Sequence, residues 1–232
     1  MAQLQGPRVE PRRAASSLVV LLHGYGANGE DLIALAHAWR SRLPETAFVA
    51  PNAPETIPGM YGALQWFALT QREPGEYWRG VTAARSLLDR FLDAELAHYA
   101  LSADRLVLVG FSQGTMLALH VGLRRAAAPA AVIGYSGLLA GPEHLAETRV
   151  RPPILLVHGE DDELIPLQAL HSAREALAQA GLPVEWHVRP GLGHGIDPGG
   201  QRMAGHFMAR ILYGSLTNFR LKRRALTSAS HP

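Results

Sequence analysis

Short apolar segments alternate with longer helical patterns along most of this chain, and this alternation restricts its fold more than any other feature. The apolar segments are expected to be strands and lie at 18–22, 46–50, 105–109, 131–135, 153–157 and 184–188. Apolar residues recur at helical spacing at about 30–43, 79–99, 114–127, 166–180 and 199–213. Strands that are apolar on both faces and separated by helices are typical of a parallel sheet covered on both sides. We therefore predict an α/β fold with a mostly parallel central sheet and helices on both faces.

The chain is expected to form one domain. No internal repeat or low-complexity linker divides it, and 232 residues suffice for one large core. We place the domain at 16–214, after an N-terminal segment at 1–15 and before a basic C-terminal tail at 215–232 that we expect to be frayed. The segment 51–78 is rich in Pro, Gly and aromatic residues. Because a loop of that length in a compact domain is usually functional, we expect it to pack over another part of the molecule.

Composition excludes several classes of protein. The chain has no cysteine, which rules out disulfides and thiolate chemistry and is consistent with the cytoplasmic location that we expect. A formal charge of +2 gives no support to nucleic-acid binding. No apolar run approaches the ~20 residues of a membrane span, and the run at 18–22 is too short for a signal-peptide core. No histidine pair has the spacing of a zinc site, so we predict neither a metal nor an organic cofactor.

A serine lies between two glycines where the strand at 105–109 gives way to a helical pattern, in the stretch Gly110-Phe-Ser112-Gln-Gly114. Glycine and serine are common in any turn, so the motif alone is weak. The same strand–turn–helix context, however, is where a G-x-S-x-G turn exposes a nucleophilic serine at its apex. We therefore predict that Ser112 is a nucleophile.

Chemically useful side chains follow three other strands. In an open parallel sheet, ligands bind beyond the carboxyl ends of the strands. The segment after 153–157 offers Glu160, Asp161 and Asp162, and a glycine-rich loop after 184–188 offers His194. A serine nucleophile needs a base, and the base needs an acid that orients it. The order serine, acid, histidine is that of the α/β-hydrolase triad, with His194 as base and all three acids open on chemical grounds.

The developing oxyanion of such a reaction requires preorganised N–H donors. The backbone N–H of Gln113, next to the serine, and that of Tyr25, in the loop after the first strand, are the expected donors. Other candidates have simpler explanations. Asp197 is an alternative orienting acid but more plausibly caps the last helix. Ser136 lacks correctly placed glycines, and seven other histidines are expected to be structural or surface residues: His23, His37, His98, His120, His158, His171 and His206.

Four stretches resemble the phospholipase/carboxylesterase family of α/β-hydrolases, which includes acyl-protein thioesterases and small bacterial carboxylesterases. They read VVLLHGYGANGEDL, VGFSQGTMLAL, PILLVHGEDDELIP and GLGHGID, and the resemblance covers about 18–213. It implies an α/β-hydrolase fold without a large cap domain. The family pattern H-G-x-x-D-x-x-[VI]-P also implies that the acid is Asp162, since Ile165 and Pro166 are then in register.

The resemblance also bears on substrate binding. The family's loop over the substrate contains a Trp-[FY] pair, and Trp66-Phe67 in the segment 51–78 matches it. These aromatics could equally anchor the loop. Leu138 and Leu164 are further expected pocket residues. The chain departs from acyl-protein thioesterases at Leu64-Gln65 and Ala68, which gives no support to a depalmitoylating role.

These inferences predict a carboxylesterase that cleaves small-molecule esters, with thioesters and lysophospholipids left open, through an acyl-Ser112 intermediate. Neither stable membrane insertion nor a nucleic-acid partner is expected, and a homodimer is compatible with an exposed aromatic loop. Two alternative functions each have a sequence feature against them. A lactonase similar to dienelactone hydrolase would normally use the cysteine that this chain lacks. An inactive binding protein on the same scaffold would normally lack a triad member, and here each is present.

Overall fold

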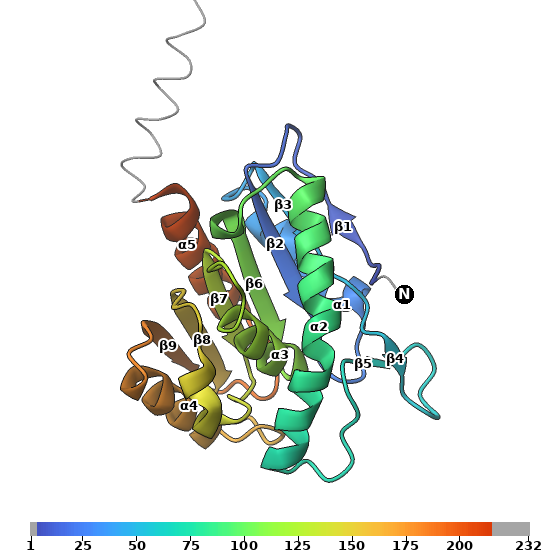
Figure 1. Cartoon of the computed structure of the whole chain (residues 1–232), viewed down its shortest axis with the longest axis vertical. Helices are drawn as coiled ribbons and strands as arrows, with labels where there is room; N and C mark the ends of the chain where they lie inside the picture. The colour runs from blue at the N-terminus through green and yellow to red at the C-terminus, as the bar shows by residue number, and fades with distance from the viewer. Residues whose placement is uncertain (1–3, 215–232) are drawn as a thin grey trace, which may run out of the picture.

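The computed structural model describes residues 4–214, which form a seven-stranded sheet between two layers of helices (Figure 1). The strand order is β1-β3-β2-β6-β7-β8-β9, and only β1 runs antiparallel to its neighbour. The strands are β1 (Arg8–Val9), β2 (Ser17–Leu22), β3 (Thr46–Val49), β6 (Leu106–Phe111), β7 (Ala131–Tyr135), β8 (Ile154–Gly159) and β9 (Val184–Arg189). The predicted α/β fold with a mostly parallel sheet is confirmed.

Helices cover both faces of the sheet. They are α1 (Gly29–Trp39), α2 (Pro74–His98), α3 (Gln113–Gly122), α4 (Gln168–Gln179) and α5 (Pro198–Tyr213), with 3-10 turns at Ala103–Arg105 and Pro142–Glu147. The core on one face packs against α2, α3 and α4, and the core on the other packs against α1 and α5 (Figure 1). Every helix and strand expected from the apolar pattern is present, with ends that differ by a few residues.

The helix ends show why the elements begin and stop where they do. The Asn28 side chain accepts hydrogen bonds from the backbone N–H groups of Glu30 and Asp31, and the Asp31 carboxylate accepts one from the Asn28 N–H in return. This reciprocal cap fixes the start of α1. Asp197 caps α5 through the Gly200 N–H at 2.7 Å. Past the end of α4, Gly181 adopts a φ of +70°, which glycine reaches without steric cost.

Two parts of the fold differ from the sequence prediction. The segment 1–15 was expected to precede the domain, but β1 pairs with β3 and Leu4 is buried, so the described part of this segment, from residue 4, contributes to the sheet and its core. The segment 51–78 is not wholly a loop: it contains a hairpin of β4 (Glu55–Thr56) and β5 (Leu64–Gln65), and its last residues begin α2. The predicted basic tail at 215–232 lies outside the described residues.

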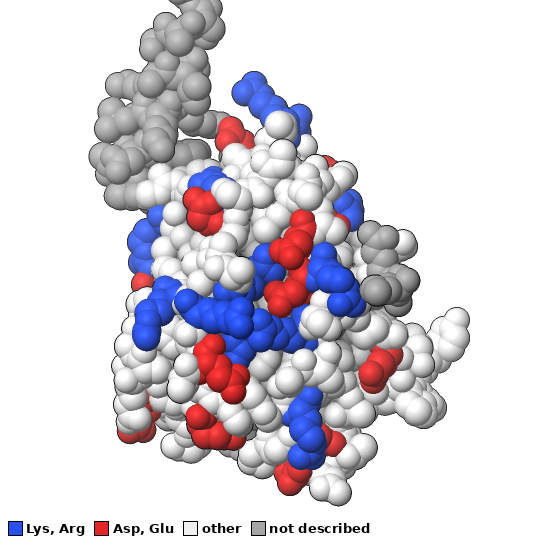
Figure 2. Space-filling view, viewed as in Figure 1, with Lys and Arg blue, Asp and Glu red and all other residues white. Residues whose placement is uncertain are grey.

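Figure 2 shows basic and acidic side chains side by side on the face covered by α2, α3 and α4. Arg125 contacts Asp89 at 3.0 Å and Asp93 at 2.6 Å, and Arg124 contacts Glu147 at 3.2 Å. The positive charges of this band are therefore largely balanced by neighbouring carboxylates. Within residues 4–214, no helix is long and apolar enough to cross a membrane.

Candidate active site

Ser112 occupies a sharp turn between β6 and α3. Its backbone has φ 54° and ψ −115°, a conformation that costs energy for any residue other than glycine. The turn also brings backbone segments into close contact. A Cβ atom on Gly110 would lie 2.3 Å from the Gly114 oxygen, and one on Gly114 would lie 1.9 Å from the Leu22 oxygen. Both glycines are thus required by the tight packing of the turn, which leaves Ser112 at its apex.

The acid and the histidine meet as the sequence predicted. His194 Nδ1 lies 2.8 Å from Asp162 Oδ2 and 3.0 Å from Oδ1. Asp162 is buried, and its Oδ1 also accepts hydrogen bonds from the backbone N–H groups of Leu164 at 3.0 Å and Ile165 at 2.9 Å. These donors fix the carboxylate, which in turn fixes the orientation of the imidazole ring.

The alternative acids lie elsewhere. Glu160 and Asp161 are exposed, and neither side chain forms a hydrogen bond with a described residue. Asp197 forms two-point contacts with the Arg189 guanidinium in addition to capping α5, and hydrogen bonding to Arg189 lowers its pKa. Among these candidates, Asp162 is the one that the structure places against His194.

Ser112 and His194 line the same cavity, of about 150 Å³, at the carboxyl ends of β2, β6 and β8. The centroids of the Phe111 and His194 rings lie 4.9 Å apart, and Phe111 forms part of the wall of this cavity. The complete lining is Gly24, Tyr25, Ala27, Leu69, Arg72, Tyr77, Phe111, Ser112, Met116, Leu164, Ile165 and His194. Because Nδ1 of His194 is engaged with Asp162, Nε2 is the ring nitrogen left for chemistry in this cavity.

Two backbone donors are free beside the serine. Within the described part of the chain, neither the Tyr25 N–H nor the Gln113 N–H forms a hydrogen bond. Tyr25 follows β2 and Gln113 follows β6, and these strands pair with Leu22 opposite Gly110. The Gln113 N–H also belongs to the first turn of α3, where the helix dipole favours negative charge.

This geometry agrees with comparisons to known proteins. The family model for phospholipase/carboxylesterase matches residues 7–212. The chain belongs to the phospholipase/carboxylesterase family. Acyl-protein thioesterase 1 of Schizosaccharomyces pombe is 30% identical over 178 residues, covering 71% of this chain and 77% of that protein. Esterase YpfH of Escherichia coli is 27% identical over 187 residues, covering 81% and 79%. The crystal structure of esterase PE8 has a TM-score of 0.87 and 40% identity, covering 90% of this chain and all of that one.

His23 and His158, the two other histidines that follow strands and precede a glycine, are held by backbone groups, as expected. His23 contacts the Gly24 oxygen through Nδ1 at 2.8 Å, and its Nε2 accepts the Ala53 N–H at 3.0 Å. His158 Nε2 contacts the Ile165 oxygen at 2.8 Å and lies 3.3 Å from Asp162 Oδ2. Burial lowers the pKa of both rings. His158 thus helps to hold the loop that carries Asp162.

The substrate residues implied by the family resemblance lie in different places. Leu164 lines the cavity with Ser112, and its side chain is exposed at the rim. Trp66 and Phe67 are buried and are not among the lining residues; the Trp66 indole N–H donates to the His23 oxygen at 2.9 Å. They anchor the loop. Leu138 lines a separate apolar groove next to the cavity.

Arg72 and Tyr77 are lining residues that the sequence analysis missed. Both lie near the start of α2, just where the pattern at 51–78 was taken for an irregular loop. Pro74 suits the first turn of a helix and would have indicated the helix start, but no signal in the sequence places position 72 at the cavity.

Proposed function

We propose that this chain is a serine esterase that hydrolyses carboxylic esters, with Ser112, His194 and Asp162 as its catalytic triad. The observation that carries this proposal is the placement of a strained, glycine-flanked serine in one cavity with a histidine whose other ring nitrogen is held by a buried carboxylate. A histidine held in this way has a fixed tautomer and can exchange protons through Nε2.

The reaction follows from these positions. His194 Nε2 takes the Ser112 proton as the serine oxygen attacks the ester carbonyl carbon. The Tyr25 and Gln113 N–H groups then stabilise the oxyanion, at about 3–4 kcal/mol per donor in comparable sites. Collapse of the tetrahedral intermediate breaks the ester bond, and His194 gives its proton to the leaving alcohol. Water, activated by the same nitrogen, releases the acid from Ser112.

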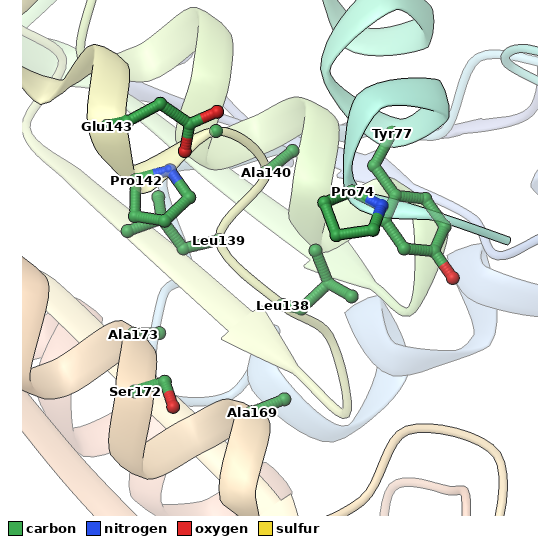
Figure 3. A pocket seen from close by; sticks show the side chains of 11 residues that line it. Pro74, Tyr77, Leu138, Leu139, Ala140, Pro142, Glu143, Ala169, Ser172 and Ala173 are labelled. Atoms are coloured by element: carbon green, nitrogen blue, oxygen red, sulfur yellow. The ribbon is translucent and has the colours of Figure 1, made fainter.

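An apolar groove of about 260 Å³ adjoins the cavity and supplies a place for a hydrocarbon part of the substrate. Figure 3 shows Pro74 and Tyr77 of α2 on one side of it and Ala169, Ser172 and Ala173 of α4 on the other, with Leu138 between them in this view. Tyr77 lines both the groove and the cavity, so the two spaces meet at this side chain. We place the hydrocarbon part of the ester in this groove, with the ester carbonyl at Ser112.

The relatives support the reaction class more strongly than a particular substrate. They are named as esterases, carboxylesterases and acyl-protein thioesterases, so both oxygen esters and thioesters are proposed as substrates. The departures at Leu64, Gln65 and Ala68 favour small-molecule esters. A cytoplasmic location, the absence of a nucleic-acid partner and a homodimer stay predictions from the sequence.

A fluorophosphonate probe tests the proposal. Labelling of the intact protein, followed by mass spectrometry of its peptides, is expected to give one adduct on Ser112. Ser112→Ala is expected to lose both the adduct and the hydrolysis of 4-nitrophenyl butyrate while its circular dichroism spectrum stays the same. Folded wild-type protein without an adduct would overturn the proposal and favour an inactive binding protein.

A further inference from the structure

Arg72 brings a positive charge to the wall of the cavity that holds Ser112. Apart from His194, it is the one titratable basic residue in the lining, and no carboxylate is among the described residues that form it. The Arg72 guanidinium is exposed and forms neither a hydrogen bond nor an ion pair within residues 4–214. The rest of the lining is largely apolar, and the exposed guanidinium stays in solvent, where salt screens its charge.

The backbone around Arg72 is held in place by Glu76. The Glu76 carboxylate accepts hydrogen bonds from the N–H groups of Thr70 at 2.7 Å, Gln71 at 3.1 Å and Arg72 at 2.6 Å. These bonds and the Thr70 hydroxyl lower the pKa of Glu76 to about 2. Arg72 itself adopts a φ of +56°, which is uncommon for a residue with a side chain. The backbone at Arg72 is thus held in place, although its side chain is exposed.

The charge of Arg72 acts at the junction of the cavity and the apolar groove. Burial and the negative charge of Glu76 raise the pKa of the Tyr77 phenol, and the positive charge of Arg72 opposes that rise. The guanidinium therefore lies within electrostatic range of Tyr77, the side chain that lines both spaces.

Other arginines near this site are already engaged. Arg79, one turn along α2, contacts Glu73 at 3.0 Å, and Arg85 contacts Asp89 at 3.3 Å. Arg124 is paired with Glu147, and Arg125 is paired with Asp89 and Asp93. Arg72 differs from them in two respects. Its guanidinium forms no ion pair with a carboxylate of the described residues, and it lines the same cavity as Ser112.

We propose that Arg72 binds an anionic group of the substrate, so that the preferred esters carry a carboxylate or phosphate close to the ester bond. A guanidinium can bind either group through two parallel hydrogen bonds. This inference rests on the proposed esterase function, since it names the substrate class of the same site. The anionic group can come from the acid part or from the alcohol part of the ester, and the two sources are distinguishable.

The test compares matched neutral and anionic esters. For the acid part, the pair is 4-nitrophenyl butyrate and the monoester of 4-nitrophenol with glutaric acid. For the alcohol part, the pair is monobutyrylglycerol and butyrylglycerol phosphate. The readout in each pair is the ratio of the two kcat/KM values, which cancels any general effect on the site. The variants are Arg72→Gln, Arg72→Lys and Arg72→Glu, with Arg79→Gln as the matched arginine control.

Wild-type protein is expected to favour the anionic ester in one pair, and that pair identifies the source of the charge. Arg72→Gln should lower the ratio about tenfold, Arg72→Lys should keep a part of the preference, and Arg72→Glu should reverse it. Arg79→Gln should keep the wild-type ratio. Added salt should weaken the preference of the wild type.

The inference is overturned if Arg72→Gln keeps the wild-type ratio in both pairs, even where the individual kcat/KM values fall. Fluorophosphonate labelling of Ser112 in every variant separates this failure from failure of the esterase function. If Ser112 is labelled but the ratio does not respond, the substrate class is wrong and the esterase proposal stands. If Ser112 is not labelled in folded wild-type protein, the esterase proposal fails first.

Discussion

The side-chain oxygen of Gln113 accepts a hydrogen bond from the backbone N–H of Trp66 at 2.9 Å. The amide nitrogen of Gln113 donates to the Phe67 oxygen at 2.7 Å, and all three residues are buried. The backbone N–H of the same glutamine is one of the two proposed oxyanion donors. One residue therefore joins the turn that carries the nucleophile to the segment that packs beside it.

Gln113→Met tests this junction. The substitution keeps the length of the side chain but leaves a buried N–H and a buried C=O unpaired, at about 1–3 kcal/mol each. We expect the free energy of unfolding, measured with urea, to fall by about 2–6 kcal/mol and kcat/KM to fall as well. Gln71→Met is the control, because Gln71 is exposed and its side chain forms no hydrogen bond within residues 4–214. Equal losses of unfolding free energy in Gln113→Met and Gln71→Met would contradict a structural role for the Gln113 side-chain hydrogen bonds.

Asp162→Asn and Asp197→Asn separate the two acids that the sequence offered. Asp162→Asn should lower kcat by about 10⁴-fold, because the amide cannot hold His194 in the reactive tautomer. Asp197→Asn should leave kcat within a few-fold of wild type, since asparagine still caps a helix. Its main effect should be a small loss of thermal stability from the lost charge opposite Arg189. The reverse pattern of kcat values would show that Asp197 orients the base.

Gly114→Ala should prevent the turn at Ser112 from forming. The added methyl group would lie 1.9 Å from the backbone oxygen of Leu22, which cannot move without displacing a central strand. We expect insoluble protein or a loss of more than about 3 kcal/mol of unfolding free energy. Gly193→Ala is the matched control, since its Cβ would meet nothing closer than 3.7 Å. A soluble Gly114→Ala protein with wild-type melting temperature would refute the packing argument.

His120 makes the protein sensitive to acid. Its ring is buried in α3 without a hydrogen-bond partner among described residues, and burial lowers its pKa to about 3 from an ordinary value of 6.5. Between these values the unfolded chain binds a proton that the folded chain does not. Stability should thus be complete above pH 6.5 and fall below it, by up to about 1.4 kcal/mol per pH unit.

His120→Phe should reduce this loss. The phenyl ring can keep the edge contact with Trp78, whose ring centroid lies 5.1 Å away. Urea unfolding at pH 6.5, 5.75 and 5.0 should give a smaller slope in the variant than in wild type. Some slope should persist, because burial also lowers the pKa of His23 and His158. The exposed His206 offers a control as His206→Gln, and an unchanged slope in His120→Phe would contradict the prediction.

The sequence predicted the sheet and the helices because those features depend on local patterns, whereas the choice of Asp162 as the partner of His194 needed the family resemblance. Buried parallel strands are continuously apolar, and their carboxyl ends must share one edge of the sheet. The strand Arg8–Val9 was missed because two residues carry no recognisable period. Its place depends on backbone pairing with Phe48 and Val49, which no local pattern reports.

The lining of the site was harder to predict. Trp66 and Phe67 matched a family pattern, but whether an aromatic ring faces a cavity or the core depends on packing. Phe67 packs so closely on Gly80 of α2 that a Cβ there would lie 2.2 Å from its ring. Arg72, by contrast, matched no family pattern. An exposed arginine in a loop has no distinguishing sequence context. Its significance comes from the strand ends that surround it in space.

Glu76 holds the loop at 70–72 mainly through backbone N–H groups, which every residue except proline possesses. The side chain at position 72 does not take part in that hold. A change of residue there can therefore alter the charge presented to a substrate without loosening the loop or moving Ser112. Descendants of this chain could acquire new substrate preferences at a single codon while the triad and its supports are inherited intact.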